Sequence, residues 1–142
     1  MHLISQMLAL SSELPEVNQV VLTAERRQFL KRRWRGIAED GTEFGFDLQT
    51  RLIDGCVIFH AENKDFVVRQ QVETVYEVSL KNTSTAAHIG WKVGNLHLPA
   101  EIFSDRIRVL HDDAMRQLLE REDWNFTEPQ VVFTPMKSMA HP

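Results

Sequence analysis

The segment HIGWKVGNLHLP, residues 88–99, contains a histidine, His97, whose imidazole could do chemistry. Gly94 and Asn95 precede it and Pro99 follows shortly after, a spacing typical of the end of a helix. The imidazole has three possible roles: it packs in the core, it closes the helix, or it binds a metal ion. A single histidine makes no metal site, because such sites take several protein ligands. The elements around His97 must decide among these roles.

The composition favours a soluble globular protein. The chain has 142 residues, enough for one ordinary domain or two small ones, and its formal net charge of −4 argues against broad, unselective nucleic-acid binding. Its single cysteine, Cys56, forms no internal disulfide and fits a reducing compartment, where we expect it to be a small buried residue. No stretch is long and apolar enough for a membrane span, and the N-terminus makes a poor signal peptide. We therefore expect a cytoplasmic protein with no membrane partner.

Residues 1–75 predict a β-rich N-terminal domain. Short runs of β-branched and aromatic residues alternate with turn residues, and Asp40-Gly41 supplies the positive φ that a tight hairpin turn needs. A compact all-β domain follows from this pattern. The runs that predict its strands are NQVVLTA, the hairpin WRGIAEDGTEFGFDL, IDGCVIFHAE and DFVVRQQ.

Residues 76–142 predict a second domain, in which strands and helices follow one another as β-α-β-β-α-β. This is the ferredoxin-like arrangement, so the predicted class of the chain is α+β. Asn82 or Ser84 would cap the first helix, and acidic residues suit the N-terminus of the second. The segments in chain order are VYEVSL, the helix NTSTAAHIGWKVGN, the strands LHLPAEIF and RIRVL, the helix DDAMRQLLERED, the strand EPQVVFTP and a short C-terminal tail.

The predicted central hairpin indicates where His97 points. If Ile102 pairs with Ile107, the antiparallel register places His97 opposite Asp112, on the face away from the core. That face of an open ferredoxin-like sheet has no helices, so His97 would be exposed unless another molecule covers it. This favours a ligand over a core histidine. The residues predicted to share the core face are Leu98, Ile102, Ile107 and Val109.

Several motifs of the chain are similar to those of one family. The segment GNLHLP resembles a Gly-Asn-Arg-His motif, with Leu96 in place of the arginine. The chain thereby resembles the UreE family of urease accessory proteins, which carry nickel to apo-urease. The resemblance implies a β-rich, protein-binding N-terminal domain and a ferredoxin-like domain that binds metal and dimerises. The other similar segments, in order, are VVLTAERRQFLKRRWR, DGTEFGFDL, LIDGCV, RIRVLHDDAMRQLL and FTP.

The resemblance implies that His97 is the principal metal ligand, contributed once by each subunit of a homodimer. A two-fold interface brings the same residue in twice, so one histidine per chain becomes two on one ion. Imidazole suits Ni²⁺, and Zn²⁺ or Cu²⁺ would also bind in vitro. Two imidazoles do not saturate nickel, and His141 in the closing MAHP is the predicted third ligand.

His111 and Asp113 are predicted as further metal ligands, each with an alternative role. His111 resembles a second histidine position of the family, and its alternative is a residue partly buried on the core side of its strand. Asp113 stands where some members have another histidine. For Asp112 and Asp113 the alternative is capping of the helix that follows.

These observations predict a nickel-binding metallochaperone that delivers Ni²⁺ for assembly of the urease active site. Its expected partners are a second copy of the chain, the urease apoprotein and other urease accessory proteins, including the accessory GTPase. We expect no enzyme activity, because the chain has no Gly-rich phosphate loop, no Ser-His-Asp order and no HExxH helix.

Two other functions stay open on the sequence alone. The basic segment 26–35 could bind nucleic acid, with Trp34 as a stacking platform, although the acidic net charge argues against it. A metal-dependent hydrolase could use His97, His111 and Asp113, but it would need a pocket with a preorganised base.

Overall fold

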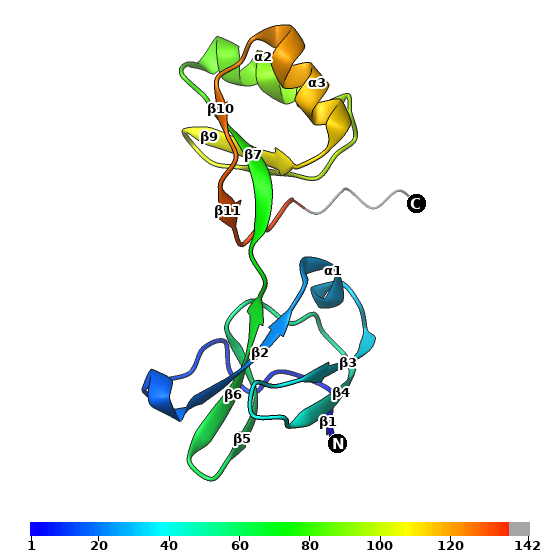
Figure 1. Cartoon of the computed structure of the whole chain (residues 1–142), viewed down its shortest axis with the longest axis vertical. Coiled ribbons are helices and arrows are strands. Elements are labelled where there is room, and N and C mark those ends of the chain that lie inside the picture. Colours follow the sequence, from blue (N-terminus) through cyan, green and yellow to red (C-terminus); the bar gives the residue numbers. More distant parts are fainter. Residues whose placement is uncertain (137–142) are drawn as a thin grey trace. The chain divides into compact units, whose positions relative to one another are not determined.

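A computed structural model of the chain describes residues 1–136, and the chain divides into two compact units between Gln71 and Val72. Figure 1 shows the two units, each with its own strands and helical turns. The mixed α+β class is confirmed. The division lies a few residues before the predicted boundary at residue 75, because strand β7 (Glu73–Ser79) pairs with strands of the second unit. The roles predicted for the two units stay predictions.

The N-terminal unit consists of two three-stranded sheets around one core. The first sheet has the order β1-β4-β3 and the second the order β2-β6-β5. Large side chains from both sheets, such as Phe44 and Ile58, are fully buried between them, and Cys56 is buried as predicted. The strands are β1 (His2–Ile4), β2 (Gln19–Ala24), β3 (Arg33–Ile37), β4 (Glu43–Asp47), β5 (Cys56–Ala61) and β6 (Lys64–Gln70).

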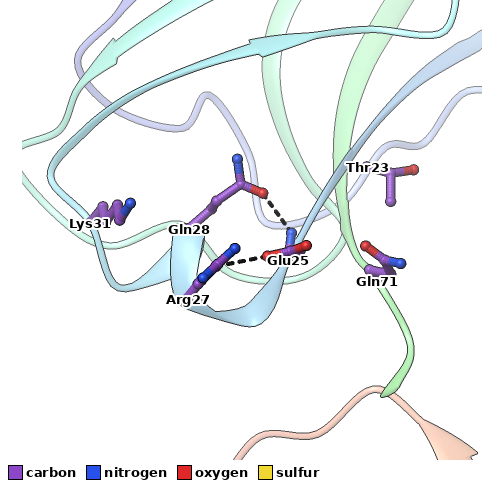
Figure 2. Close-up of a pocket in the computed structure, with 6 residues that line it drawn as sticks. All are labelled: Thr23, Glu25, Arg27, Gln28, Lys31 and Gln71. Atoms are coloured by element: carbon purple, nitrogen blue, oxygen red, sulfur yellow. Dashed lines mark hydrogen bonds and ion pairs between the residues drawn. The ribbon is translucent and has the colours of Figure 1, made fainter. Parts of the chain in front are cut away.

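The hairpin predicted around Asp40-Gly41 is confirmed: β3 and β4 pair antiparallel, and Gly41 has a φ of 89°. Strand β1 and two short helical segments of this unit were not predicted. A 3₁₀ turn covers Glu16–Asn18, and helix α1 (Arg26–Phe29) occupies the first half of the basic segment. The side chain of Gln28 accepts a hydrogen bond from the backbone N–H of Glu25 at 2.7 Å, which closes the first turn of α1 (Figure 2).

The C-terminal unit has the element order β-α-β-β-α-β, with its last strand in two pieces. Its antiparallel sheet has the order β10-β7-β9-β8, and β11 also pairs with β7. The apolar stripes of both helices pack on one face of the sheet, against Tyr76, Val78 and their neighbours (Figure 1). The elements after β7 are α2 (Thr83–Gly94), β8 (Ala100–Ile102), β9 (Arg106–Leu110), α3 (Asp113–Glu122), β10 (Phe126–Thr127) and β11 (Gln130–Val131).

Both helices of this unit begin and pack as their sequences predict. The side chain of Asn82 accepts a hydrogen bond from the backbone N–H of Thr85 at 2.9 Å, so Asn82 is the cap of α2. Met115, Leu118 and Leu119 form the buried stripe of α3. Within residues 1–136, no helix is both long and apolar enough to cross a membrane.

The last predicted strand, EPQVVFTP, is only partly formed. Pairing with β7 starts earlier, at Phe126, and keeps the same register to Val131, but between Thr127 and Gln130 the ladder retains only the bond from the backbone N–H of Val75 to Pro129 O, at 3.0 Å. Proline has no N–H to donate to the ladder, so the strand is interrupted there. Beyond β11, Phe133 is fully buried.

Candidate metal-binding site

His97 lies in the turn that follows α2. The backbone N–H of Leu96 donates to Val93 O at 3.0 Å, and that of His97 donates to Gly94 O at 3.1 Å. These bonds wind the chain into a tight turn, in which His97 takes a φ of 56°. This left-handed conformation is uncommon for a residue with a side chain. Leu96 packs against the core before His97, and Leu98 packs against it afterwards.

The side chain of His97 is exposed, as predicted, but for a different reason. The strand expected over residues 96–103 begins only at Ala100, so His97 is not in the sheet and does not lie opposite Asp112. Pro99 and the left-handed backbone of His97 prevent an extended ladder there. Among the described residues, the imidazole has no hydrogen-bond or ion-pair partner. Its nitrogens are therefore free to bind a ligand.

The predicted register of the hairpin is confirmed. For one residue, Ile102, the predicted burial in the core is wrong. Ile102 pairs with Ile107, and Ala100 pairs with Val109. Ile107 and Val109 are buried, but Ile102 is 53% exposed. Ile102 ends the short edge strand β8 and lies outside the cluster that the helices cover.

His111 follows β9 and already has partners within its unit. Its Nε2 lies 2.8 Å from an oxygen of Glu128, and its ring stacks on Tyr76 with the centroids 4.4 Å apart. The stacking places the ring on the core side of the sheet, as predicted, but 43% of the side chain is exposed because the strand ends at Leu110. Arg116 lies 3.6 Å from Glu128 and brings positive charge to this position.

The charge on Arg116 is fixed by its neighbours. Hydrogen bonds to Glu120 and to Tyr76 raise the pKa of its guanidinium, which therefore stays protonated. A metal ion beside Glu128 would meet that positive charge, so the contact between His111 and Glu128 is a poor cation site.

The two aspartates before α3 differ in role. Asp112 is the cap of the helix: its carboxylate accepts from the backbone N–H groups of Ala114 and Met115, at 2.8 and 3.3 Å. The capping alternative is thus confirmed for Asp112. Asp113 is the exposed first residue of the helix, where its charge suits the positive end of the dipole.

The described residues of the predicted site do not form one metal cluster. The β8-β9 hairpin brings His97 and His111 to the same end of the sheet, since the backbone N–H of Leu110 donates to Pro99 O. Nevertheless, no group of three or more His, Cys, Asp or Glu side chains within residues 1–136 could hold a metal ion. His141 lies outside the described residues.

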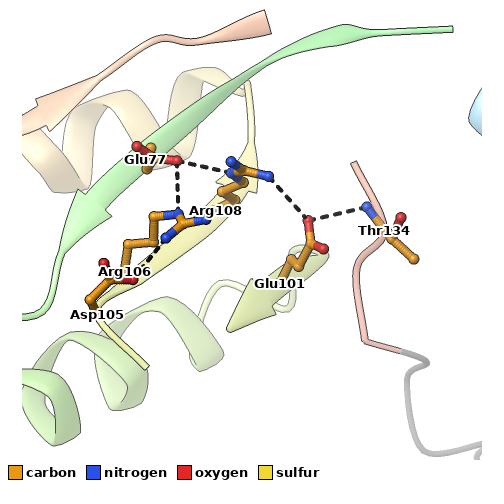
Figure 3. A network of polar contacts seen from close by, with 6 residues as sticks. All are labelled: Glu77, Glu101, Asp105, Arg106, Arg108 and Thr134. Carbon is orange, nitrogen blue, oxygen red and sulfur yellow. Dashed lines mark hydrogen bonds and ion pairs between the residues drawn. The ribbon is translucent and has the colours of Figure 1, made fainter. Parts of the chain in front are cut away.

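A polar network on the helix-free face of the sheet was not predicted. Arg108 pairs with Glu77 at 2.9 Å and with Glu101 at 4.0 Å, while Arg106 pairs with Glu77 at 3.4 Å (Figure 3). Both guanidiniums lie over the ring of Phe103. The alternation of arginine with apolar residues in RIRVL was the signal: it places both arginines on the face opposite the core.

The network also holds the end of the described chain beside β8. The backbone N–H of Thr134 donates to Glu101 at 3.2 Å, as Figure 3 shows, and that of Met136 donates to Ala100 O at 2.8 Å. Met136 therefore lies close to Ala100, the first residue of β8. Ala100 is three residues after His97.

Exposed apolar side chains belong to the same unit as His97. Trp91, on the last turns of α2, is 64% exposed, and Ile102, the last residue of β8, and Met136 are exposed as well. A Cβ added at Gly90 or Gly94 of α2 would meet open space, so this helix surface has no cover.

Comparison with known proteins gives one consistent result. The family model for the UreE urease accessory protein, C-terminal domain, matches residues 73–141. A urease accessory protein UreE of Chelativorans sp. (strain BNC1) is 33% identical over 107 residues, which cover 74% of this chain and 68% of the relative.

Two further relatives extend the comparison. Urease accessory protein UreE 1 of Brucella suis biovar 1 is 30% identical over 76 residues, or 54% of this chain and 47% of the relative. The match thus spans about half of that relative's length. A urease accessory protein UreE of Rhizobium meliloti is 23% identical over 129 residues, 91% of this chain and 84% of the relative.

Proposed function

The chain belongs to the UreE family of urease accessory proteins, and from that premise we propose that it binds Ni²⁺ and delivers the ion for assembly of the urease active site. A protein of this family is a chaperone of urease maturation and not an enzyme. In this proposal nickel is the cargo: it is bound, carried and released without chemical change. Zn²⁺ or Cu²⁺ would occupy the same site in vitro.

One observation carries the assignment of the site: His97 presents a free imidazole from a turn that is anchored on both sides. Leu96 and Leu98 hold the backbone to the core while the side chain between them is exposed. A ligand fixed in this way loses little conformational entropy when it binds an ion. Its exposure also lets ligands be exchanged one at a time, which delivery requires.

A second copy of the chain would complete the site. One imidazole is too few for nickel, and a two-fold axis beside His97 would supply two. The exposed apolar side chains of Trp91, Ile102 and Met136 support an interface of this kind, because a dimer would remove them from water. We therefore propose a homodimer held by the C-terminal units.

His141 is the proposed third ligand, and the anchored end of the described chain supports it. Met136 is held beside Ala100, near the end of the turn that contains His97. His141 is five positions beyond Met136, and five residues span at most about 17 Å. The proposed ligand therefore lies within that distance of the anchored residue.

His111 and Asp113 stay predicted as weaker, secondary ligands. His111 would have to give up its contact with Glu128, beside the cationic Arg116, and Asp113 would have to bind without leaving the first turn of α3. The proposed partners are the urease apoprotein and the other urease accessory proteins, including the accessory GTPase, in the cytoplasm.

The test is a calorimetric titration of Ni²⁺ combined with a mass measurement by light scattering. We expect a dimer and about one tightly held ion per dimer, since each chain supplies half of the site. The variant His97→Ala should lose this binding by orders of magnitude, because both imidazoles of the shared site are removed at once.

Two results would contradict the proposal. A protein that is monomeric at micromolar concentration with and without nickel cannot form a shared site. A strong, independent site on each chain that survives His97→Ala would instead assign the metal to His111 and Asp113.

A further inference from the structure

A groove of about 760 Å³ lies on the sheet β1-β4-β3 of the N-terminal unit. The pairing of Leu3 and Arg35 with Gly45 places these three residues on one face of the sheet. Phe44 and Phe46, which flank Gly45, point to the opposite face and are buried in the core. The groove is thus on the outer face, away from the packed interior.

The floor of this groove is apolar. Leu3 is 81% exposed, and Met1 beside it is also exposed. A Cβ added at Gly45 would come within 3.2 Å of both side chains, so the glycine lets them lie flat on the strand. An exposed leucine in a groove offers a contact for one apolar side chain of a partner.

The rim of the groove is basic. Arg32 and Arg33 share Asp47, at 3.0 and 3.4 Å, and one carboxylate cannot neutralise two guanidiniums. Arg35 lines the same groove and has no ion-pair or hydrogen-bond partner among the described residues. The groove therefore carries unbalanced positive charge next to an apolar floor.

The first half of the basic segment has a different surface. It lines a smaller pocket of about 420 Å³, whose walls are the polar and charged side chains drawn in Figure 2. There Arg27 pairs with Glu25 at 2.8 Å, and no apolar side chain offers a contact. The combination of charge and apolar surface is found in the groove and not in this pocket.

The groove is poorly suited to nucleic acid. Trp34, the aromatic residue of the basic segment, stacks on Phe46 with the ring centroids 4.0 Å apart and packs against the core. Its ring is therefore occupied and makes no platform for a base.

We propose that this groove binds an acidic segment of a partner protein, with an apolar side chain on Leu3 and carboxylates on Arg33 and Arg35. Guanidiniums pair well with carboxylates, and an apolar anchor adds the contact that charge alone does not give. The proposal rests on the proposed function only for the identity of the natural partner, a protein of urease assembly. The groove and its ligand class can be tested without nickel.

The probe is a fluorescein-labelled peptide of alternating glutamate and leucine, followed by fluorescence anisotropy. The unaltered protein should bind it, and added salt should weaken the complex. Arg35→Glu should lower the affinity by about tenfold, because it replaces an attraction with a repulsion. Leu3→Ser should lower it several-fold. Arg51→Glu, which makes the same charge change at an exposed arginine outside the groove, should leave it unchanged.

Thermal melts of the three variants should match that of the unaltered protein, and their nickel titrations should be the same. Loss of nickel binding in His97→Ala with the peptide still bound would separate the two proposals. The docking proposal is overturned if the unaltered protein does not bind the peptide, or if Arg51→Glu weakens binding as much as Arg35→Glu. It is also overturned if a lysine-leucine peptide or single-stranded uridine RNA binds as tightly as the acidic peptide.

Discussion

His97 combines an exposed side chain with a left-handed backbone, as the turn residues Glu62 and Asn63 also do. A residue with a Cβ is strained by about 1–2 kcal/mol in this conformation, and glycine is not. The family motif places glycine and asparagine before the histidine. In this chain the residue with the positive φ is the histidine itself.

Substitution of His97 tests that reasoning directly. His97→Ala should change the free energy of unfolding by no more than about 0.5 kcal/mol, because an exposed side chain buries little. His97→Gly should stabilise the protein by about 0.5–1 kcal/mol relative to the alanine variant, since glycine adopts this φ without strain. Both variants should lose tight nickel binding. Urea denaturation and nickel titration provide the two measurements.

The opposite pattern would assign His97 to the core. A marked loss of stability in both variants, with nickel affinity retained, would show that the imidazole supports the fold. The structure argues against this, because the side chain has no partner within residues 1–136.

At the level of the elements, substitution of Asp112 at the start of α3 distinguishes helix capping from metal binding. Asp112→Ala should destabilise the protein by about 1 kcal/mol, because two backbone N–H groups lose their acceptor. Asp112→Asn should keep nearly all of the stability, since asparagine caps a helix equally well. Neither change should affect nickel affinity. A thermal melt and a nickel titration of the pair distinguish the two roles.

The asparagine variant is the informative control. It keeps the cap but removes the charge that a metal ion would attract. A fall in nickel affinity in Asp112→Asn without a fall in stability would therefore make Asp112 a ligand, contrary to its geometry.

The periodic elements could be predicted from the sequence, because their patterns report burial directly. The apolar stripe of α3 and the pairing of Ile102 with Ile107 follow from periods of 3.6 and 2 residues. The start of β8 could not be predicted in this way. It depends on a turn at His97, and a left-handed histidine leaves no mark in a hydrophobic pattern.

The sequence predicted that His97 is exposed, which the structure confirms, but it did not predict the surroundings of this residue. The motif singled out His97. We expected its side chain to be exposed because we placed it on a strand, whereas it is exposed from a turn. The arrangement of the residues around His97 depends on contacts between residues far apart in the sequence. The ion pair of His111 with Glu128 and the anchoring of Thr134 by Glu101 join residues far apart in the sequence, and no local pattern encodes them.

On the scale of the whole molecule, the chain has two cores and two proposed contact surfaces. The groove on the N-terminal unit is the proposed site for an acidic partner, whereas the C-terminal unit, with exposed Trp91, Ile102 and Met136, is proposed to contact a second copy. Because each unit has its own core, a change on one surface should leave the other unit folded.

Trp91→Glu is the sharpest test of the proposed dimer. The side chain is 64% exposed, so a single folded chain should tolerate the charge with a change of no more than about 0.5 kcal/mol. In the dimer the same charge would be buried without a partner, which costs several kcal/mol and should give a monomer. Tight nickel binding should disappear although His97 is intact. Val17→Glu, at an exposed apolar residue of the N-terminal unit, is the matched control and should stay dimeric. Light scattering and nickel titration measure both effects, and a nickel-binding dimer of Trp91→Glu would place the interface elsewhere.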